Sequence, residues 1–371
     1  MENYDLDNFE PAAKIVVIGV GGAGNNAVNR MIDEEISNVE FYVANTDKQA
    51  LATSKSPNRI ILGEELTGGL GAGGEPEQGE KAARASEETI RNIVKDANMV
   101  FIAAGMGGGT GTGAAPVIAE IAKSIEGKDI LVVAIVTRPF AFEGKKRIKN
   151  SIQGLNKLKG IVDSLIVVSN DKLLVSNSNA QISEAFSNAD AVLAQSVRTV
   201  VNLILLPAII NLDFADVKAT LQNSGVGMIG FGVGTGPNRA KDAASSAINS
   251  PLLETSINGA RKAIVAVTCG PQVSLFDAQD AVNSLINATG HDMDIKFGVE
   301  INPQLNDEIL VSVIAADFEE EFSFEDTAGT IMPTRTAAES LLTPDHSSNE
   351  SASKKEADET DDYILPNFLK D

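Results

Sequence analysis

Gly105-Met-Gly-Gly-Gly-Thr-Gly-Thr-Gly113 lies between an apolar run, residues 99–104, and an expected helix that starts near Ala114. An apolar run that ends in glycines and then turns helical is typical of a buried strand, a tight loop and a helix N-terminus. The six glycines let backbone N–H groups approach an oxyanion, and Thr110 and Thr112 offer hydroxyls. Because the helix adds the positive end of its dipole, the segment predicts a phosphate-binding loop. The competing interpretation is a glycine loop that binds no ligand.

A second glycine-rich segment follows the first apolar run of the chain, residues 14–19. It has the G-x-G-x-x-G spacing of a dinucleotide-binding loop, at Gly19, Gly21 and Gly24. The next expected strand, residues 39–45, is followed by Asp47, at the place where an acid that binds ribose is expected. On its own, this pattern favours a dinucleotide-dependent oxidoreductase.

A third glycine-rich segment, residues 68–74, weakens the oxidoreductase interpretation. A dinucleotide fold needs one such loop, whereas several phosphate-facing loops at successive strand ends favour a triphosphate enclosed from several sides. No catalytic constellation of His, Lys or Tyr accompanies the dinucleotide-like loop. The chain also has no Walker A sequence, because neither Gly-Lys pair, 127–128 or 144–145, is followed by Ser or Thr.

Expected strands and helices alternate along the first half of the chain, which implies a parallel sheet covered by helices on both faces. The ligand then lies beyond the carboxyl ends of the strands, where the glycine-rich loops fall. We predict an α/β fold with a Rossmann-like parallel-sheet nucleotide domain, a long central helix and a smaller α/β C-terminal domain. The expected strands are residues 14–19, 39–45, 99–104, 129–136, 164–169, 227–233, 263–269, 294–301 and 309–315. The expected helices are one that ends near Asp33 and residues 80–96, 114–125, 144–159, 182–206, 239–249 and 277–288.

Composition and pattern divide the chain into six segments. The expected segments are a flexible arm at 1–12, a nucleotide-binding domain at 13–181, the central helix at 182–206, a C-terminal domain at 207–318, an acidic linker at 319–361 and a terminal peptide at 362–371. The linker is rich in Glu, Asp, Ser and Thr, so we expect it to be disordered, with a reach of roughly 35 Å. The terminal peptide carries an apolar patch formed by Tyr363, Ile364, Leu365, Pro366, Phe368 and Leu369. This patch predicts a ligand for a partner protein, and the alternative is a frayed end without function.

The 371 residues carry a formal net charge of −21, and 43% of them are hydrophobic. This charge argues against nucleic acid or an anionic membrane as a direct partner, because phosphate backbones are bound by basic faces. Residues 317–371 hold 15 acidic and 4 basic residues, which leaves the preceding part only mildly acidic. One cysteine, Cys269, excludes an intrachain disulfide, and two distant histidines, His291 and His346, form no metal site. No signal peptide or membrane-spanning apolar run is present, so we expect a soluble, cytoplasmic protein.

Five segments together resemble one known family. They are Asn45-Thr-Asp47, Gly105-Met-Gly-Gly-Gly-Thr-Gly-Thr-Gly-Ala-Ala-Pro116, Thr137-Arg-Pro-Phe-Ala-Phe-Glu-Gly144, Asn211-Leu-Asp-Phe-Ala-Asp-Val217 and Ser250-Pro-Leu-Leu-Glu254. The glycine-threonine loop is the signature of the tubulin superfamily, and the whole set resembles FtsZ proteins, the bacterial relatives of tubulin. The resemblance covers about residues 13–318 and implies the tubulin/FtsZ fold. The end segment 362–369 is similar to the tail peptide through which FtsZ proteins reach membrane anchors and regulators.

The resemblance implies which residues bind the nucleotide. Those that match the first nucleotide loop of the family are Gly21, Gly22, Ala23, Gly24, Asn25 and Asn26, and those that match its main phosphate loop are Gly108, Gly109, Thr110, Gly111 and Thr112. Glu143 and Arg147 match residues on the ribose side, and Asn170 and Asp190 match residues that select guanine. We assign five more residues to the same site, namely Asp47, Gly73, Gly74, Pro139 and Phe186.

Asp190 suits the selection of guanine on chemical grounds. Its carboxylate can accept from the N1–H and the exocyclic amine of guanine, a donor pair that adenine does not offer. The alternative is an ordinary polar position on a helix.

The acidic turn 211–216 lies at the far end of the expected central helix from Asp190. Asp190 and Asp213 are 23 residues apart, or roughly 35 Å at about 1.5 Å per residue. A nucleotide is too short to touch both, so an acid of this turn that takes part in hydrolysis must act on a nucleotide held by another molecule. Head-to-tail stacking follows, and a heterologous contact that does not close gives a filament.

The resemblance agrees with this geometry, because it implies that the acidic turn of each subunit completes the GTPase site of its neighbour. The implied catalytic residues are Asn211, Asp213 and Asp216, with the two aspartates orienting the attacking water. The alternative for Asp213 is an N-cap of the following helix, and both roles can hold at once.

Two positions depart from the family pattern near the expected γ-phosphate. Glu75 stands where an amide is usual, and Glu80 stands where a basic residue is common. Two extra negative charges are expected to weaken nucleotide binding or to demand more cation. Glu75→Asn is therefore predicted to raise the affinity for GTP.

We predict a GTP-dependent, self-assembling cytoskeletal protein that forms head-to-tail filaments of the division ring and hydrolyses GTP between subunits. The expected ligands are GTP or GDP with Mg²⁺ and, as a further candidate, a monovalent cation; side chains alone provide no metal site. The expected partners are other copies of the chain and, through the terminal peptide, membrane-anchoring and regulatory division proteins. The expected place is the cytoplasm at the division site, with no nucleic acid and only indirect membrane contact. The alternatives are the oxidoreductase and a nucleotide-binding scaffold that polymerises without hydrolysis.

Overall fold

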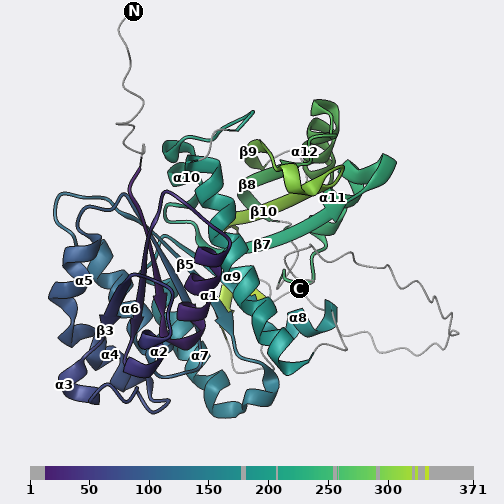
Figure 1. Ribbon diagram of the computed structural model, residues 1–371. Helices are drawn as coiled ribbons and strands as arrows, with labels where there is room; N and C mark the ends of the chain where they lie inside the picture. Colours follow the sequence, from purple (N-terminus) through teal and green to yellow (C-terminus); the bar gives the residue numbers. More distant parts are fainter. Residues whose placement is uncertain are drawn as a thin grey trace, which may run out of the picture.

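One ten-stranded sheet runs through the part of the chain that the computed structural model describes (Figure 1). The described residues are 13–176, 181–205, 208–253, 257, 259–289, 293–319, 322–324 and 331–333. The strand order in the sheet is β3-β2-β1-β4-β5-β6-β7-β10-β8-β9. The strands are β1 (Ile15–Val20), β2 (Glu40–Asn45), β3 (Asn58–Ile61), β4 (Met99–Gly105), β5 (Leu131–Arg138), β6 (Ser164–Ser169), β7 (Gly225–Gly234), β8 (Ala260–Cys269), β9 (Asp294–Ile301) and β10 (Ile309–Phe318).

Helices connect the strands and cover both faces of the sheet (Figure 1). They are α1 (Gly21–Asp33), α2 (Lys48–Ala52), α3 (Glu64–Thr67), α4 (Pro76–Ala85), α5 (Glu87–Val94), α6 (Thr110–Lys123), α7 (Lys145–Lys159), α8 (Asn170–Ser176), α9 (Ile182–Leu205), α10 (Phe214–Leu221), α11 (Arg239–Ile248) and α12 (Leu275–Thr289).

The strands from β3 to β7 run parallel, as the alternation of strands and helices predicts. Strand β10 is antiparallel to both β7 and β8, and β9 is parallel to β8. Ser164 of β6 pairs with Gly225 of β7, so the sheet of the second half continues the sheet of the first. The expected smaller α/β unit thus extends the first sheet, and the domain bounds stay a prediction.

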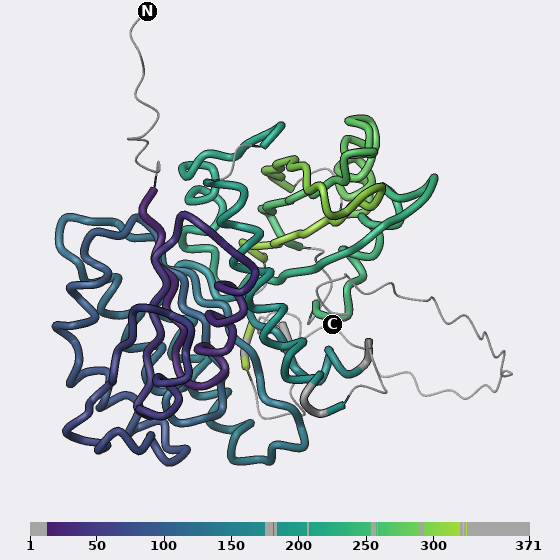
Figure 2. Tube along the Cα trace, in the orientation of Figure 1, coloured from purple at the N-terminus to yellow at the C-terminus, as the bar shows by residue number. Residues whose placement is uncertain are grey.

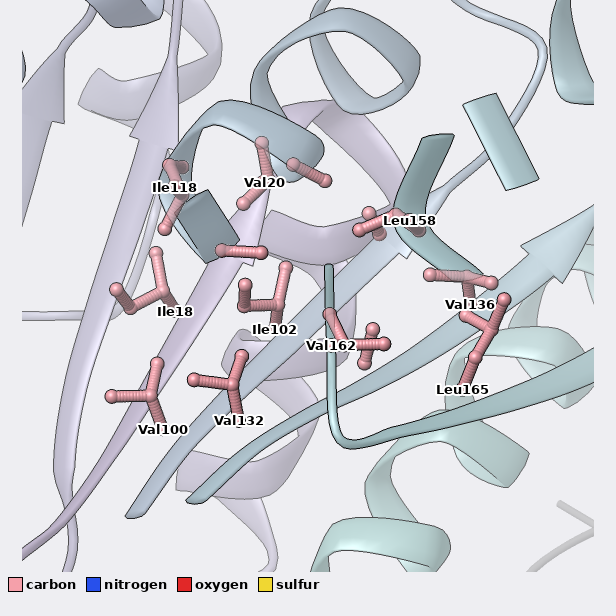
Figure 3. Packing of buried hydrophobic residues seen from close by; sticks show 14 of the residues in the cluster. Ile18, Val20, Val100, Ile102, Ile118, Val132, Val136, Leu158, Val162 and Leu165 are labelled. Atoms are coloured by element: carbon pink, nitrogen blue, oxygen red, sulfur yellow. The ribbon is translucent and has the colours of Figure 1, made fainter. Parts of the chain in front are cut away.

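Side chains of the central strands alternate between two layers of core. On β1, Val16, Ile18 and Val20 join one cluster, and Ile15 and Val17 join the other. Figure 3 shows the first cluster, in which Ile18 and Val20 lie with Val100, Ile102, Ile118, Val132, Val136, Leu158, Val162 and Leu165. Because both faces are buried, the central strands are nearly continuous apolar runs, which is the pattern of a parallel sheet.

Some elements differ from the expectation. The single helix expected at 80–96 is two helices, α4 and α5, which meet at Ser86. Helix α6 begins at Thr110 rather than near Ala114, so part of the glycine-threonine segment is its first turn. The sequence pattern does not indicate β3, α2, α3 and α8, because segments of four to seven residues are too short to show a period.

Helix α9 lies between the N-terminal and C-terminal halves of the chain (Figure 2). Its 24 residues give a length of about 36 Å. The helix confirms the expected central helix, with its end at Leu205. Figure 1 shows α8 beside one end of α9 and α10 beside the other. Across the described ranges, α9 included, no helix has an apolar stretch long enough to cross a bilayer.

Two short strands, β11 (Phe322–Phe324) and β12 (Ile331–Pro333), fall inside the segment 319–361 that was expected to be disordered. The expectation is therefore wrong for these residues. Phe322 and Phe324 are buried in the first core cluster, and α7 holds their backbone: Lys159 Nζ donates to the Phe322 carbonyl oxygen at 2.7 Å. The burial of these two phenylalanines against the core outweighs the polar composition of the segment, which had predicted disorder. The arm at 1–12, the rest of the linker and the terminal peptide lie outside the described residues.

Candidate nucleotide-binding site

A cavity of about 420 Å³ lies where the loops that follow β1, β4, β5 and β6 meet. The expected site residues that line it are Gly21, Gly22, Ala23, Asn26, Gly108, Gly109, Thr110, Gly111, Pro139, Glu143, Arg147, Asn170, Phe186 and Asp190. Four more line it without having been assigned, namely Gly105, Met106, Thr137 and Ala189. Gly105 and Met106 belong to the glycine-threonine segment, and Thr137 begins the family segment 137–144, so the sequence could have indicated these three residues; Ala189 lies in none of the quoted segments.

Close backbone packing holds the loop between β1 and α1. A Cβ atom on Gly19 would lie 2.3 Å from the Gly24 carbonyl oxygen, and one on Gly24 would lie 2.2 Å from the Ala103 carbonyl oxygen. The glycine spacing is therefore explained by the contact between helix and strand. Asn25 is buried, and its amide nitrogen, turned toward the carbonyls, donates to Gly19 and Gly21 at 3.0 and 2.9 Å. Gly24 and Asn25 thus shape the loop but do not line the cavity.

The main loop, residues 105–109, leads into the N-terminus of α6. The N–H of Gly107, at a φ of 105°, donates to the buried hydroxyl of Thr112 at 2.8 Å. Thr112 therefore braces the loop from behind and does not line the cavity. A Cβ atom on Gly108 would meet nothing within 4 Å, so the backbone there is open to a ligand. A helix N-terminus behind an open glycine backbone suits an anion.

The third loop, residues 68–75, packs against the main loop. A Cβ atom on Gly109 would lie 2.8 Å from the Ala72 Cβ and 2.9 Å from the Glu75 backbone nitrogen. Gly73 and Gly74 have φ values of 59° and 75°, which favour glycine, and both are exposed. Neither lines the cavity, so their contact with a nucleotide stays a prediction.

Glu75 and Glu80 both have basic partners. Glu75 forms an ion pair with Lys146 of α7. Glu80 accepts from Lys157 at 2.8 Å, and this hydrogen bond holds the pKa of Glu80 below its usual range. Arg84 lies 3.4 Å from the same carboxylate. Neighbouring cations therefore offset much of the repulsion that the sequence alone predicts for these two acids.

Asp47 caps a helix. Its Oδ1 accepts from the Gln49 N–H at 2.8 Å at the start of α2, and Asp47 is not among the residues that line the cavity. The preceding residue reaches the first residue of α6, because the Thr46 and Thr110 hydroxyl oxygens lie 2.7 Å apart. The capping role explains Asp47 locally, and a ribose contact stays a prediction.

Asn170, Phe186 and Asp190 line the cavity from α8 and α9. Asn170 is 5% exposed, and its Oδ1 is buried without a hydrogen-bond partner among the described residues. Burial raises the pKa of Asp190 to about 7, against the opposing effects of Arg30 and Asn26. An unpartnered buried oxygen and a carboxylate that line the same cavity fit a ligand with several N–H donors, as guanine has.

An aromatic cluster and an ion pair fix the loop after β5. The Phe140 N–H donates to Glu143 Oε1 at 2.9 Å, and the other carboxylate oxygen of Glu143 pairs with Arg147. The buried Phe140 ring stacks on Phe142 at 4.9 Å between centroids and meets Phe186 edge-on at 5.0 Å. These contacts place Glu143, Arg147 and Phe186 at the wall of one cavity.

Two family models match the chain. The model described as the Tubulin/FtsZ family GTPase domain matches residues 14–178, and the FtsZ family C-terminal domain matches residues 225–319. Among solved structures, the empty FtsZ dimer of M. jannaschii is 42% identical, with a TM-score of 0.82 over 88% of this chain and 94% of that one. The chain belongs to the FtsZ family. This membership makes it a cytoskeletal GTPase that binds guanine nucleotide, in place of the oxidoreductase alternative.

Two CetZ proteins of Haloferax volcanii share the FtsZ fold at lower identity. The CetZ2 structure, a GTPγS-bound protofilament, is 21% identical with a TM-score of 0.69, over 82% of this chain and 93% of that one. The CetZ1 structure, a GDP-bound monomer, is 20% identical with a TM-score of 0.70, over 81% and 93%. At these identities the likeness concerns the fold alone.

The acidic turn of this FtsZ-family chain lies apart from its own cavity. None of Asn211, Asp213 and Asp216 lines the cavity, and Figure 1 shows α10, which follows the turn, at the end of α9 away from α8. Asp190 lies 15 residues before Leu205, the last residue of α9, so the helix alone carries the chain about 22 Å away from Asp190 before the turn begins. The full separation of roughly 35 Å between Asp190 and Asp213 stays a prediction, and the turn lies outside the residues that line the cavity.

Each of the three polar residues expected to act in hydrolysis has a local partner. Asp213 Oδ1 accepts from the Asp216 N–H at 2.8 Å and caps α10. Asn211 Oδ1 accepts from the Ala208 N–H at 2.7 Å, and a carboxylate oxygen of Asp216 lies 3.9 Å from Lys296 Nζ. The turn is thus an ordered, largely exposed feature of the surface. Within the described residues, no three His, Cys, Asp or Glu side chains gather as metal ligands.

Proposed function

We propose that this FtsZ-family chain assembles head to tail and hydrolyses GTP at the contact between two subunits. The observation that carries the proposal is the position of the acidic turn, exposed and outside the cavity of its own chain. Self-association is supported by the M. jannaschii FtsZ structure at 42% identity, which is described as a dimer. A heterologous contact of this kind repeats without closing and gives a filament.

In the proposed reaction, one subunit binds GTP and the next supplies the acids. Asn170 and Asp190 accept from the guanine donors, and the N-terminus of α6 with Gly108 receives the phosphates. We place the third loop against the terminal phosphate, because it packs on the main loop through Ala72 and Glu75. Mg²⁺ would supply positive charge that stabilises the transferring phosphoryl group.

Asp213 and Asp216 of the neighbouring subunit orient and polarise the attacking water in this proposal. Asp213 is exposed, so a partner can approach it, and the cap fixes its direction. Asn211 donates a further hydrogen bond from its amide nitrogen to the water or to phosphate, because its Oδ1 already accepts from the Ala208 N–H. A monovalent cation is a further proposed ligand of the same site.

We further propose that the filament belongs to a division ring in the cytoplasm at the septum. The terminal peptide 362–371, which lies outside the described residues, then binds membrane-anchoring and regulatory proteins through its apolar side chains. Contact with the membrane is indirect and nucleic acid is not a partner, since the chain carries a net charge of −21.

A nucleotide-binding scaffold that assembles without hydrolysis is the second candidate. It is favoured by the hydrogen bond from the Asp216 N–H to Asp213, because this bond gives Asp213 a structural role that needs no catalysis.

Turnover of GTP per subunit, measured over a range of protein concentrations, tests the proposal. We expect turnover near zero at low concentration and a rise above a threshold, because the site is complete only between subunits. The variant Asp213→Asn keeps a capping oxygen but loses the charge, so it should bind GTP and lose about a hundredfold in turnover. Flat turnover per subunit, or an active Asp213→Asn, contradicts the shared site.

Mixing two inactive variants separates a shared site from a site within one chain. Asp213→Asn can hold GTP but lacks the acid, and Asp190→Ala lacks the guanine acceptor but keeps the acidic turn. In a shared site, a contact between the two kinds of subunit is complete, so the mixture regains turnover. If each site is built from one chain alone, the acidic turn of one variant cannot complete the site of the other, and the mixture stays as inactive as its components.

A further inference from the structure

Asn150 lies on α7, is 9% exposed and belongs to none of the sequence motifs. Its amide nitrogen donates to the Gly74 carbonyl oxygen at 3.3 Å and to the Gly107 carbonyl oxygen at 3.3 Å. Gly74 belongs to the third loop and Gly107 to the main loop. One side chain therefore ties the two glycine-rich loops to each other and to α7.

The three elements that meet at Asn150 are already in close contact. A Cβ atom on Gly107 would lie 2.8 Å from the Arg147 carbonyl oxygen of α7. On the other side, Lys146, one turn before Asn150, pairs with Glu75 of the third loop. Packing brings the backbones together, but it does not determine which way their carbonyl groups point. The amide of Asn150 supplies that direction, because a donor selects the carbonyl oxygen.

The direction of the Gly107 carbonyl has a consequence at the next residue. In a trans peptide unit the C=O and the following N–H point in opposite directions. Because Asn150 donates to the Gly107 carbonyl oxygen, the N–H of Gly108 points in the opposite direction, away from the Asn150 side chain. Gly108 lines the cavity. Asn150 thus keeps a carbonyl oxygen, which repels phosphate, out of a position where a donor is needed.

The third loop needs such an anchor because of its glycines. Gly71, Gly73 and Gly74 have φ values of 95°, 59° and 75°, and a Cβ atom on Gly73 or Gly74 would meet nothing within 4 Å. Residues with this freedom and few neighbours lose much conformational entropy when they are ordered. The Gly71 N–H donates to the Thr46 carbonyl oxygen at 3.1 Å, which holds only the start of the loop. Asn150 holds its end.

We propose that Asn150 is a positioning residue that holds the third loop against the main loop and thereby sets the preference of the site for GTP over GDP. The inference rests on the proposed placement of the third loop at the terminal phosphate. Asn150 itself does not line the cavity. Its loss should weaken contacts with the terminal phosphate more than contacts that GTP and GDP share.

The test is equilibrium binding of GTPγS and GDP to protein kept below the concentration at which it assembles. We compare Asn150→Ala, which removes the side-chain amide, and Asn150→Leu, which keeps a side chain of similar size without the donor and adds no charge. The first control is Asn156→Ala, the same substitution on the same helix, where the amide donates to the Phe324 carbonyl oxygen. The second control is Ser151→Ala, which removes a buried hydroxyl that has no partner in the described chain.

For both Asn150 variants we expect the Kd of GTPγS to rise about fivefold to tenfold, the loss of one to two hydrogen bonds, with less than about a twofold change for GDP. Both controls should leave the ratio of the two constants unchanged. Equal weakening of both ligands, or no weakening, overturns the inference while the nucleotide site stands. Failure of the unaltered protein to bind either nucleotide overturns the proposed site instead.

Hydrogen exchange gives a second measurement that does not depend on a well-folded alanine variant. In Asn150→Ser, the backbone amides of the third loop should exchange faster by about fivefold, whereas amides of β5 and β6 keep the protection of the unaltered protein. Unchanged exchange in the third loop contradicts the anchoring role.

Discussion

The carboxylate of Asp213 accepts a hydrogen bond from the backbone N–H of Asp216 at 2.8 Å, so one proposed catalytic acid positions the other. Substitution can separate the cap from the charge. Asp213→Ala removes both and should lower the free energy of unfolding by about 1 kcal/mol, whereas Asp213→Asn, with an accepting oxygen, should change it by only a few tenths. Urea denaturation checks these values. Equal destabilisation by the two variants contradicts the capping role.

Asp190 gives nucleotide binding a pH dependence. Burial raises the pKa of this carboxyl to about 7, and only the ionised form accepts from both guanine donors. Affinity for GDP should therefore rise about tenfold between about pH 6 and about pH 8, as the competent fraction grows. Titration calorimetry measures this rise. Asp190→Asn is the control, since it binds more weakly but retains only the pH dependence of the phosphates; an equal slope in both proteins contradicts the role of Asp190.

The same group affects the stability of the nucleotide-free protein in the opposite sense. The pKa in the fold, about 7, lies above the ordinary value of 3.8, so the fold favours the protonated acid. This contribution is fully present below about pH 4 and is lost as the pH rises through about 7. At about pH 8, Asp190→Asn should therefore be more stable than the unaltered protein without nucleotide, as thermal unfolding would reveal. A less stable variant at that pH is the contrary result.

Glu75 remains a test of charge beside the phosphates. Its side chain is 51% exposed and paired with Lys146, and exposed pairs contribute little, so we expect Glu75→Asn to raise GTP affinity by only about twofold to fivefold. The gain in affinity comes from Lys146, whose positive charge is no longer paired with Glu75 and can attract the phosphates. This gain should shrink at high salt, because exposed charges are screened. Direct titration at two ionic strengths measures it. An unchanged or weaker affinity at low salt counts against the expectation.

The contribution of β11, which lies against α7, to stability can be tested by truncating Phe322. This side chain is 5% exposed within the first core cluster, and truncation of a buried phenylalanine costs about 3 kcal/mol or more. Phe322→Ala should therefore lower the denaturation midpoint strongly. Phe276→Ala is the matched control, since Phe276 is 78% exposed and should matter little to the unassembled chain. Similar midpoints for the two variants show that β11 does not stabilise the fold.

Local patterns account for the strands and loops that could be predicted. β1, β4, β5 and β6 are apolar runs of six to eight residues, each followed by a glycine or polar segment. Apolar runs of this length are buried in most folds, so composition and length are enough to predict that these segments are buried strands. β3 and α8 could not be found in this way, because four and seven residues show no reliable period.

Within the site, the residues assigned from motifs divide according to what lies near them in space. Gly21, Gly108 and Asp190 line the cavity, whereas Thr112 braces the main loop and Asp47 caps α2. A motif specifies residue types at fixed spacing, but the direction of a hydroxyl or carboxylate depends on which backbone N–H lies closest after folding.

The glycine-threonine segment therefore determined the strand, the loop and the helix that make a phosphate site, because glycine permits backbone conformations whatever the distant surroundings. The tertiary structure alone decided that Lys146 neutralises Glu75, that Asn150 joins the two loops, and that Phe322 returns to the core. Those contacts join residues far apart in the sequence. They depend on how helices pack on the sheet, and packing is a property of the whole fold rather than of any local pattern.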